Sequence, residues 1–373
     1  MKKVLLTATV QSHICQFHKP LVEILHNHGY EVHVAAKDNL MEKNGLKLDF
    51  VDKVYNVPFS RSPKSFDNIK AYNQLKNIIT NGGYDVIHCN TPMAGIVTRI
   101  AAKKERKAGT KVFYTAHGFH FYKGAPMKNW LIYYPVEKLF ANYTDILITI
   151  NEEDYKLAKE KFNTDVRRIH GVGVDENRYS PVSYEQKSKM RESLGFTENQ
   201  KIILCVGELL PNKNQKMIVN VMKSLKKDFP DCILLLAGNG PEKDNIEKEI
   251  NALGIEQNVK MLGYCTFLEQ YQRIADVAVS CSKREGLPLN IVEAMLTGNP
   301  VIATSNRGHC ELIHNGINGF IVPIDDEVSM YKYIKKIFLD DLYRNKLSDN
   351  ALQIAHLFGF ESVKKELQQI YFN

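Results

Sequence analysis

Apolar runs of strand length alternate with segments of helical period along most of the chain, and this alternation constrains the fold more than any other feature. The first example has an apolar run at Val4 to Thr9, then Phe17, Leu21, Ile24 and Leu25 on one helix face, a stop at Gly29, and a second run at Tyr30 to Ala35. A strand, a crossover helix and a second strand form a βαβ unit, whose parallel strands are covered on both faces. The chain is therefore expected to be an α/β protein.

The pattern continues, is interrupted once, and starts again. Gly171-Val172-Gly173-Val174-Asp175 and a polar segment break it, and a new series opens at Ile202 to Val206. The 373 residues suffice for two α/β domains, each with its own core. We expect domains at 1–172 and 173–355, and a helix at 356–373 that crosses back to the first. Further strands are predicted at 86–89, 112–115, 146–150, 233–237, 259–262, 277–280, 301–303 and 319–322, and helices at 66–80, 93–107, 129–142, 152–161, 331–338, 342–355 and 360–371.

The sequence argues against a disulfide-rich protein, a transmembrane protein and a signal peptide. The seven cysteines lie scattered in apolar runs, and neither a C-x-x-C pair nor a histidine cluster has metal-ligand spacing, so we expect reduced cysteines, no metal and a cytoplasmic location. No apolar run approaches the roughly 18 residues that span a bilayer. The apolar run after Met1-Lys2-Lys3 ends at Gln11, too early for a signal peptide.

Basic residues crowd between Arg99 and Lys111, where six cations face Glu105 alone. Aromatic residues from Phe119 to Tyr134 follow in the sequence. Two interpretations stay open: a surface that rests on an anionic inner leaflet, or a solvated basic helix followed by ordinary aromatic core. Nucleic-acid binding is disfavoured because no recognition motif accompanies the charge.

The segment from Glu285 to Glu293 is the most informative for function. It follows a buried strand and enters a helix near Pro288, and ligands of doubly wound sheets bind at the carboxyl ends of strands. A helix N-terminus attracts anions, so a diphosphate suits the N–H groups around Asn290 to Val292. Glu293 would then accept hydrogen bonds from ribose hydroxyls and Glu285 would contact a sugar. The competing interpretation is a helix-capping acid and a solvated one.

This pair of glutamates, separated by seven residues, resembles the signature of retaining glycosyltransferase family 4. That family has the GT-B fold of two doubly wound, Rossmann-like domains facing across a cleft. Gly207-Glu208-Leu209 with Lys213 resembles the family's phosphate-clamping loop, although Glu208 stands where the family usually has arginine. Arg273, Arg284 or Arg307 would be the candidates to compensate. Further matches lie at the Gly238-Asn239-Gly240 turn and at Gly263-Tyr264, which resembles the family's nucleotide-base contact.

The first domain carries the remaining matches. His117 follows a predicted strand and resembles the family's cleft histidine, which contacts the donor sugar; a lone histidine with a purely structural role is the alternative. The loop with Gln11, Ser12 and His13 stands where many family members carry glycines, and is assigned to the acceptor side. Arg307 and His309 depart from the family's usual glycine pair, as in a polysaccharide-assembly subgroup.

The resemblance covers residues 4 to 320 and implies a retaining, metal-independent glycosyltransferase without a cofactor. The donor is expected to be a UDP-linked hexose or N-acetylhexosamine. The acceptor is expected to be a glycan or an undecaprenyl-diphosphate-linked acceptor, in capsule or exopolysaccharide synthesis. A nucleotide-sugar epimerase of the same fold and a non-catalytic donor-binding subunit are the alternatives. His117 and Glu285 are the expected catalytic residues, Gly171 and Gly173 are expected hinges, and the nucleotide-sugar contacts are Gly207, Glu208, Lys213, Asn239, Gly263, Tyr264, Leu287, Asn290, Ile291, Val292 and Glu293.

Overall fold

The computed structural model describes residues 1–42 and 45–373. The chain forms two compact units, one of Met1–Gly173 with Phe360–Asn373 and one of Val174–Gly359. The chain passes from one unit to the other between Gly173 and Val174 and again between Gly359 and Phe360. The last helix therefore belongs to the first unit.

The first unit is built on a seven-stranded parallel sheet of order β3-β2-β1-β4-β5-β6-β7. In register, Val4 of β1 lies opposite Val32 on one side and Val86 on the other. The strands are β1 (Lys2–Val10), β2 (Tyr30–Lys37), β3 (Lys53–Asn56), β4 (Val86–Asn90), β5 (Lys111–Ala116), β6 (Ile146–Thr149) and β7 (Asp165–Arg168).

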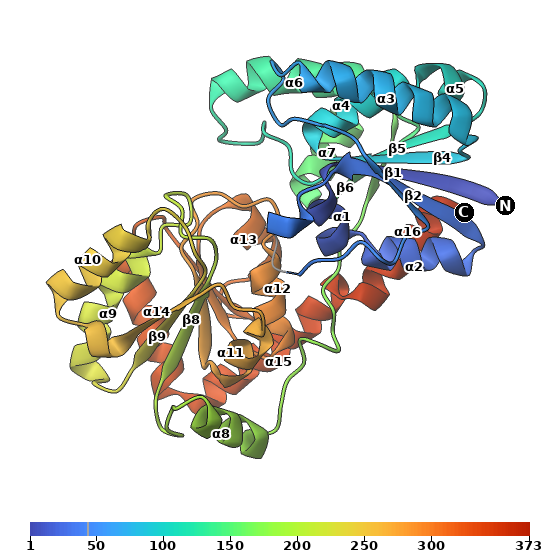
Figure 1. The fold of residues 1–373 in the computed structure, drawn as a ribbon. Helices are drawn as coiled ribbons and strands as arrows, with labels where there is room; N and C mark the ends of the chain where they lie inside the picture. Colours follow the sequence, from blue (N-terminus) through green and yellow to red (C-terminus); the bar gives the residue numbers. More distant parts are fainter. Residues whose placement is uncertain (43–44) are drawn as a thin grey trace. The chain divides into compact units, whose positions relative to one another are not determined.

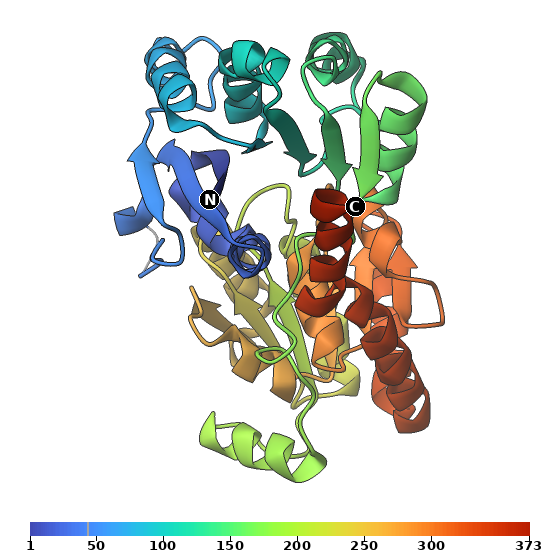
Figure 2. The ribbon, with the colours of Figure 1, turned by 90° about the vertical axis from the view of Figure 1, so that its right-hand side faces the viewer.

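Helices cover both faces of this sheet. Figures 1 and 2 show α3, α4 and α6 together on one side, and α2 packs with the C-terminal α16 on the other. The helices of this unit are α1 (Gln11–Phe17), α2 (Lys19–Asn27), α3 (Asp67–Gly82), α4 (Pro92–Ala101), α5 (Lys103–Lys107), α6 (Met127–Ala141), α7 (Glu152–Lys161) and α16 (Phe360–Phe372), with a short 3-10 turn η1 (Leu40–Glu42).

The second unit repeats the design with six parallel strands of order β10-β9-β8-β11-β12-β13. The strands are β8 (Ile202–Val206), β9 (Ile233–Ala237), β10 (Val259–Gly263), β11 (Val277–Ser280), β12 (Val301–Thr304) and β13 (Gly319–Val322). The helices are α8 (Tyr184–Ser193), α9 (Lys216–Asp228), α10 (Lys243–Leu253), α11 (Leu268–Ile274), α12 (Leu289–Leu296), α13 (Arg307–Leu312), α14 (Glu327–Leu339) and α15 (Asp341–Ala355), with 3-10 turns η2 (Glu256–Asn258) and η3 (His356–Phe358).

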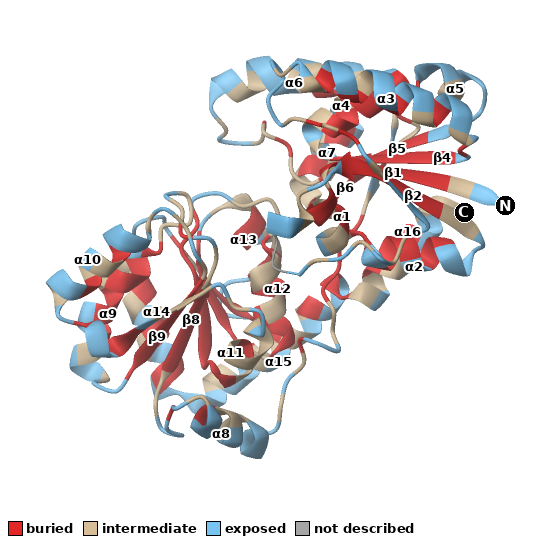
Figure 3. Ribbon diagram, viewed as in Figure 1, coloured by how far each residue is buried: buried red, intermediate tan, exposed pale blue. Residues whose placement is uncertain are grey.

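The core of the second unit lies on both faces of its sheet. Along β8, Ile203 and Cys205 pack into the cluster under α9 and α14, while Ile202 and Leu204 pack toward α11. Side chains alternate between the two faces of a strand, so a strand covered on both faces is apolar at every position. In Figure 3, β8 and β9 are buried, and exposed residues lie on the outer faces of the helices and in the loops. The prediction of two doubly wound α/β domains is confirmed.

One local prediction was wrong, and several elements were not predicted. The segment from Gln11 is helix α1 rather than a loop, and a separate α2 follows because Pro20 has no N–H with which to continue the first helix. Strands β3 and β7 were missed because both are short and polar at the ends of the sheet. Helix α8 was missed because its residues are mostly polar; a capping box at Ser183 marks its start.

The basic run of the first unit is only partly on the surface. Arg99 is 1% exposed, stacks on Tyr114 at 4.1 Å and pairs with Glu137 at 3.3 Å. Arg106 pairs with Asp145 at 3.0 Å. The exposed cations of the run are Lys103, Lys104, Lys107 and Lys111. Among the described residues, no helix is both long enough and apolar enough to cross a membrane.

Candidate functional site

In the second unit, the loops at the carboxyl ends of β8 and β9 approach each other very closely. Gly207 N–H donates to the carbonyl of Ala237 (2.9 Å), and Leu209 N–H donates to the carbonyl of Asn239 (2.9 Å). A Cβ on Gly238 would lie 2.0 Å from the carbonyl oxygen of Gly207, and Gly238 has a φ of +146°. Only glycine tolerates both the conformation and the contact, so this turn fixes the position of the loop after β8 relative to the loop after β9.

The loop after β11 is joined to the loop after β8. Lys283 N–H donates to the carbonyl of Asn212 (2.8 Å), and Asn212 Nδ2 donates to the carbonyl of Arg284 (3.0 Å). Helix α12 then begins at Leu289, one residue after the predicted Pro288, and Asn290 Nδ2 donates to the carbonyl of Val206 (2.8 Å). These bonds hold the start of α12 beside the end of β8.

An ion pair connects the same two loops through their side chains. Lys213 Nζ lies 2.5 Å from Glu285 Oε1, and the two side chains are 23% and 14% exposed. A charge-assisted hydrogen bond of this kind is short and orients both groups. A ligand that binds either side chain must therefore compete with its partner. Glu208 lies on the same loop as Lys213 and is exposed.

Glu293 lies in the second turn of α12 with an unusual environment. Burial raises the pKa of its carboxyl to about 7, although the charge of Arg178 and a hydrogen bond from Tyr179 oppose the shift. Arg178 also donates to Glu269 Oε2 through Nε (3.0 Å) and Nη2 (2.9 Å). A half-buried carboxyl that titrates near neutral pH is typical of functional sites.

The other residues around α12 contribute mainly backbone. Ile291 and Val292 are 2% and 0% exposed, and Leu287 packs on the same core cluster. Their side chains therefore face the core. After β10, Gly263 accepts a hydrogen bond from Gly238 N–H (2.7 Å), and the neighbouring Tyr264 is 61% exposed.

The arginines and the histidine near this site have different surroundings. Arg273 donates to the carbonyls of Ser180 (3.1 Å) and Arg178 (2.9 Å) and so braces a loop, whereas Arg284 is exposed. His309 is fully buried: Nδ1 donates to the carbonyl of Thr304 (2.5 Å) and Nε2 lies 3.0 Å from the Ser280 hydroxyl. Burial lowers its pKa to about 4, so it is neutral at pH 7.

In the first unit, His117 follows β5 and contacts His13 of α1. Their Nε2 atoms are 3.2 Å apart, and His117 Nε2 lies 3.3 Å from Asn90 Oδ1. Burial lowers the pKa of His117 to about 4, so its imidazole is neutral. Burial, with a smaller contribution from His117, also lowers the pKa of His13 well below its usual value.

The neighbours of His13 on α1 are engaged inside the unit. Gln11 and Ser12 are 5% and 4% exposed. Gln11 Nε2 donates to the carbonyl of Ala36 (3.5 Å), and Ser12 exchanges two bonds with Asn39, from its N–H (3.1 Å) and to its hydroxyl (2.9 Å). Of the three residues assigned to the acceptor side, only His13 is half-buried rather than buried.

Comparisons with known proteins cover both units. Residues 3–151 match the model of the glycosyl transferase 4-like family, and residues 186–354 match that of glycosyl transferases group 1. The chain is 41% identical to the putative glycosyltransferase EpsD of Bacillus subtilis over 99% of this chain and 96% of that protein. The chain belongs to glycosyltransferase family 4.

A more distant relative and a solved structure also match this family 4 transferase over most of its length. It is 27% identical to the UDP-Gal:alpha-D-GlcNAc-diphosphoundecaprenol alpha-1,3-galactosyltransferase of Escherichia coli, over 92% of this chain and 88% of that one. The crystal structure of Anabaena Alr3699/HepE in complex with UDP superimposes with a TM-score of 0.79, at 22% identity and 99% coverage of both chains. Together with the two parallel sheets, this similarity establishes the GT-B fold.

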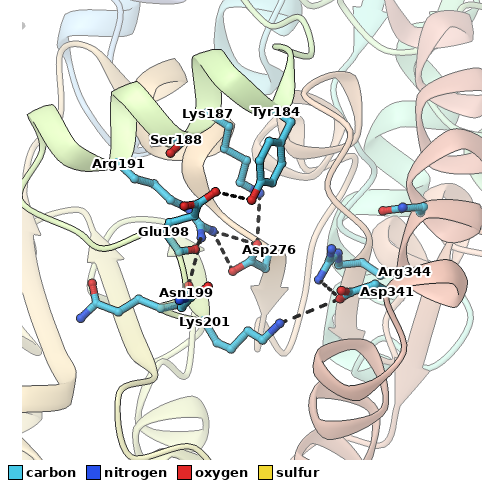
Figure 4. A pocket seen from close by; sticks show the side chains of 12 residues that line it. Tyr184, Lys187, Ser188, Arg191, Glu198, Asn199, Lys201, Asp276, Asp341 and Arg344 are labelled. Atoms are coloured by element: carbon cyan, nitrogen blue, oxygen red, sulfur yellow. Dashed lines mark hydrogen bonds and ion pairs between the residues drawn. The ribbon is translucent and has the colours of Figure 1, made fainter.

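A cavity of about 310 Å³ in the second unit lies away from these loops (Figure 4). It borders Lys201 and Asp276, at the amino ends of β8 and β11, which is the opposite end of the sheet. Arg191 Nη2 contacts both carboxylate oxygens of Asp276 at 2.8 Å, and Asp276 also accepts from Ile202 N–H (2.9 Å). In the family 4 transferase this network ties α8 to the sheet.

Sequence reasoning missed one cluster altogether. The sequence shows no histidine cluster with metal-ligand spacing, but folding brings His13, His18 and His117 together. His18 of this group was not singled out, and neither was His88, whose ring centroid lies 6.2 Å from that of His18. The ligand spacing is invisible in the sequence because His117 is 104 residues from His13.

Proposed function

We propose that this family 4 transferase moves a hexose or N-acetylhexosamine from a UDP-sugar to an undecaprenyl-diphosphate-linked glycan, with retention, in capsule or exopolysaccharide synthesis. The joined loops at the carboxyl ends of β8, β9 and β11 are the observation that carries the proposal. The relatives support the choice of substrates: the Anabaena protein was crystallised with UDP, and the Escherichia coli enzyme is named for UDP-galactose and a diphosphoundecaprenol acceptor.

In the proposed donor complex, Glu293 accepts hydrogen bonds from the ribose hydroxyls and Tyr264 contacts the base. The diphosphate binds at the N-terminus of α12 through the backbone of Asn290 to Val292, where the helix dipole favours negative charge. Lys213 supplies the neutralising cation. Gly207 and Asn239 belong to the turns that let the donor approach the backbone.

The exposed carboxylate of Glu208 places a negative charge on the loop that would hold the diphosphate. Glu285 already orients Lys213 through their ion pair. When the diphosphate binds Lys213 in place of Glu285, the carboxyl of Glu285 becomes available to the transferred sugar. We assign the phosphate site to Lys213 and the N-terminus of α12, without a second basic residue. Arg273 instead binds the carbonyls of Ser180 and Arg178 and has a structural role.

In the transfer step, the acceptor hydroxyl oxygen forms a bond to the anomeric carbon while the bond from that carbon to the β-phosphate oxygen breaks. The acceptor proton passes to the departing phosphate oxygen on the same face, so the configuration is retained. His117, a neutral imidazole, and Glu285 orient the sugar by hydrogen bonds to its hydroxyls. No residue of the chain becomes covalently linked to the sugar.

The experiment measures binding of UDP and a panel of UDP-sugars to the purified chain by calorimetry, and then UDP release with and without a lipid-diphosphate acceptor. Lys213→Ala should weaken UDP binding by about 10- to 100-fold, the equivalent of one charge-assisted hydrogen bond. Lys216→Ala is the matched control, because Lys216 is 61% exposed and pairs with Glu249 instead. Conversion of a UDP-sugar into its epimer, without acceptor and without net UDP release, would favour the epimerase, and binding without any turnover would favour the non-catalytic subunit.

A lipid-linked acceptor also calls for contact with a membrane surface, and we assign that contact to α6. Met127, Leu131, Pro135 and Leu139 follow one another at four-residue intervals on this helix and are all exposed; Met127 and Leu131 are more than 70% exposed. Neighbouring positions of a helix face are four residues apart, so these side chains form an apolar stripe.

Exposed lysines accompany the stripe. Lys128 and Lys138 lie on α6 itself, and the exposed lysines of α5 lie near its C-terminal end, where Lys103 Nζ is 5.3 Å from the Tyr143 ring centroid. An apolar stripe flanked by cations is typical of helices that lie on anionic bilayers. We therefore propose peripheral attachment to the cytoplasmic face of the membrane.

The attachment is tested by sedimentation with vesicles of phosphatidylglycerol and of phosphatidylcholine. The double variant Leu131→Glu with Leu139→Glu should lose binding to the anionic vesicles while UDP affinity is unchanged. Ile69→Glu on α3 is the control, because Ile69 is 58% exposed in the same unit but outside the stripe. Equal vesicle binding by the double variant and the control would show that α6 is not the membrane contact.

A further inference from the structure

Three imidazoles from separate parts of the first unit meet in its interior. His13 lies on α1, His18 at the junction of α1 and α2, and His117 after β5. One ring nitrogen of each lies within 4.8 Å of those of the other two. The ring centroids of His18 are 5.3 Å from His13 and 5.7 Å from His117. We call these three residues the histidine cluster.

The fourth histidine nearby, His88, has both ring nitrogens engaged. Its Nδ1 lies 2.5 Å from the Tyr371 hydroxyl, and its Nε2 lies 2.7 Å from the Thr115 hydroxyl. It therefore forms part of the wall behind the histidine cluster and contributes no ligand atom.

His18 differs from His88 because its Nε2 is buried with no hydrogen-bond partner among the described residues. The side chain is 4% exposed. A buried polar atom without a partner is costly, and such atoms in native proteins are usually satisfied by water or an ion. This nitrogen is the observation that points to a ligand beyond the three histidines themselves.

The spacing of the other two nitrogens suits a metal ion. Nitrogen ligands lie about 2.0–2.1 Å from zinc, so two corners of a tetrahedral site are about 3.4 Å apart. The Nε2 atoms of His13 and His117 are 3.2 Å apart. The remaining separations, up to 4.8 Å, need a modest rotation of the His18 ring to close on the same ion.

We propose that the histidine cluster binds one divalent transition-metal ion, with zinc as the best fit. Three neutral imidazoles are a ligand set that suits zinc, copper and nickel and leaves one position open. The ion would hold His117 away from a donor sugar, so it would inhibit transfer; this second part rests on the function proposed above, whereas metal binding does not. The site is thus an inhibitory metal site built into the first unit.

The test uses the full chain without a polyhistidine tag, in a Cys310→Ser background that removes an exposed thiol. Calorimetry with Zn²⁺ should give one ion per chain, and Co²⁺ should give the intense visible absorption of tetrahedral coordination. His18→Ala and, separately, His13→Asn should weaken zinc binding by about 100-fold, and His314→Ala, which alters an exposed histidine of the second unit, should leave it unchanged. Two site variants are used so that poor folding of one leaves the other informative.

Zinc binding that is equally strong in both site variants, or absent from the parent chain, would overturn the proposal. Inhibition is then measured as UDP release: zinc should inhibit the parent chain, while His18→Ala should keep its turnover and lose the sensitivity. Tight zinc binding through the cluster without inhibition would uphold the metal site and refute the role given to His117. UDP binding to the parent chain and to the Lys213→Ala variant of the second unit is measured separately, and it tests the proposed function without testing the metal site.

Discussion

Replacing Glu293 by glutamine should stabilise the free protein at pH 8. The pKa of this carboxyl is raised from 4.5 to about 7, chiefly by burial. Above pH 7 the folded protein must keep a charge in a poorly hydrated place, and the unfolded chain does not. The difference between these two pKa values lowers the free energy of unfolding at pH 8 by about 3 kcal/mol, at about 1.4 kcal/mol for each pH unit.

The pH dependence separates this cause from others. Between pH 4.5 and 7 the folded protein holds a proton that the unfolded chain has released, so the wild type loses stability as the pH rises through this window. Glutamine resembles the protonated acid and retains an oxygen that can accept from Tyr179. The variant should therefore match the wild type at pH 4 and exceed it by about 3 kcal/mol at pH 8, or about 6 to 12 °C for a domain of this size.

Thermal unfolding at pH 4 and pH 8, in the absence of nucleotide, measures the difference. Glu269→Gln is the matched control, because that acid binds Arg178 in a two-bond ion pair and its loss should destabilise. The same variant should bind UDP more weakly than the wild type, since an amide offers the ribose hydroxyls one uncharged accepting oxygen in place of the two oxygens of a carboxylate. A Glu293→Gln protein that is less stable than the wild type at pH 8 would refute the reasoning.

Two further changes test the packing of the second unit, one beside the site and one at the opposite end of its sheet. Gly238→Ala should weaken UDP binding at least tenfold, because its Cβ would lie 2.0 Å from the carbonyl oxygen of Gly207. Overpacking of this kind costs about 1–3 kcal/mol and would displace the loop after β8. Calorimetry measures the UDP affinity, and an unchanged affinity would contradict the prediction. Asp276→Asn should lower the free energy of unfolding by about 3–5 kcal/mol, because it leaves the buried Arg191 without its anion. Asp341→Asn, at the 67% exposed rim of the same cavity, is the control for chemical denaturation, and equal losses in the two variants would count against a buried ion pair.

Much of the fold was predictable because buried parallel strands are continuous apolar runs. β8, β9, β11 and β13 have the predicted bounds, since each run is apolar on both faces and ends at a turn. β3 and β7 escaped prediction because strands at the ends of a sheet are short and tolerate polar residues. The family resemblance, carried by Glu285 to Glu293 and the glycine turns, is confirmed by the relatives.

The chemistry of the site depended on the fold. Two doubly wound domains, the family and the loops expected to carry the site could be predicted, because these follow from local periodicity and from motifs of a few neighbouring residues. The fold was needed to show that Lys213 pairs with Glu285, that burial raises the pKa of Glu293, and that His13, His18 and His117 meet. Each depends on groups 72 to 104 residues apart or on how far a side chain is removed from water, and neither quantity has a local signal in the sequence.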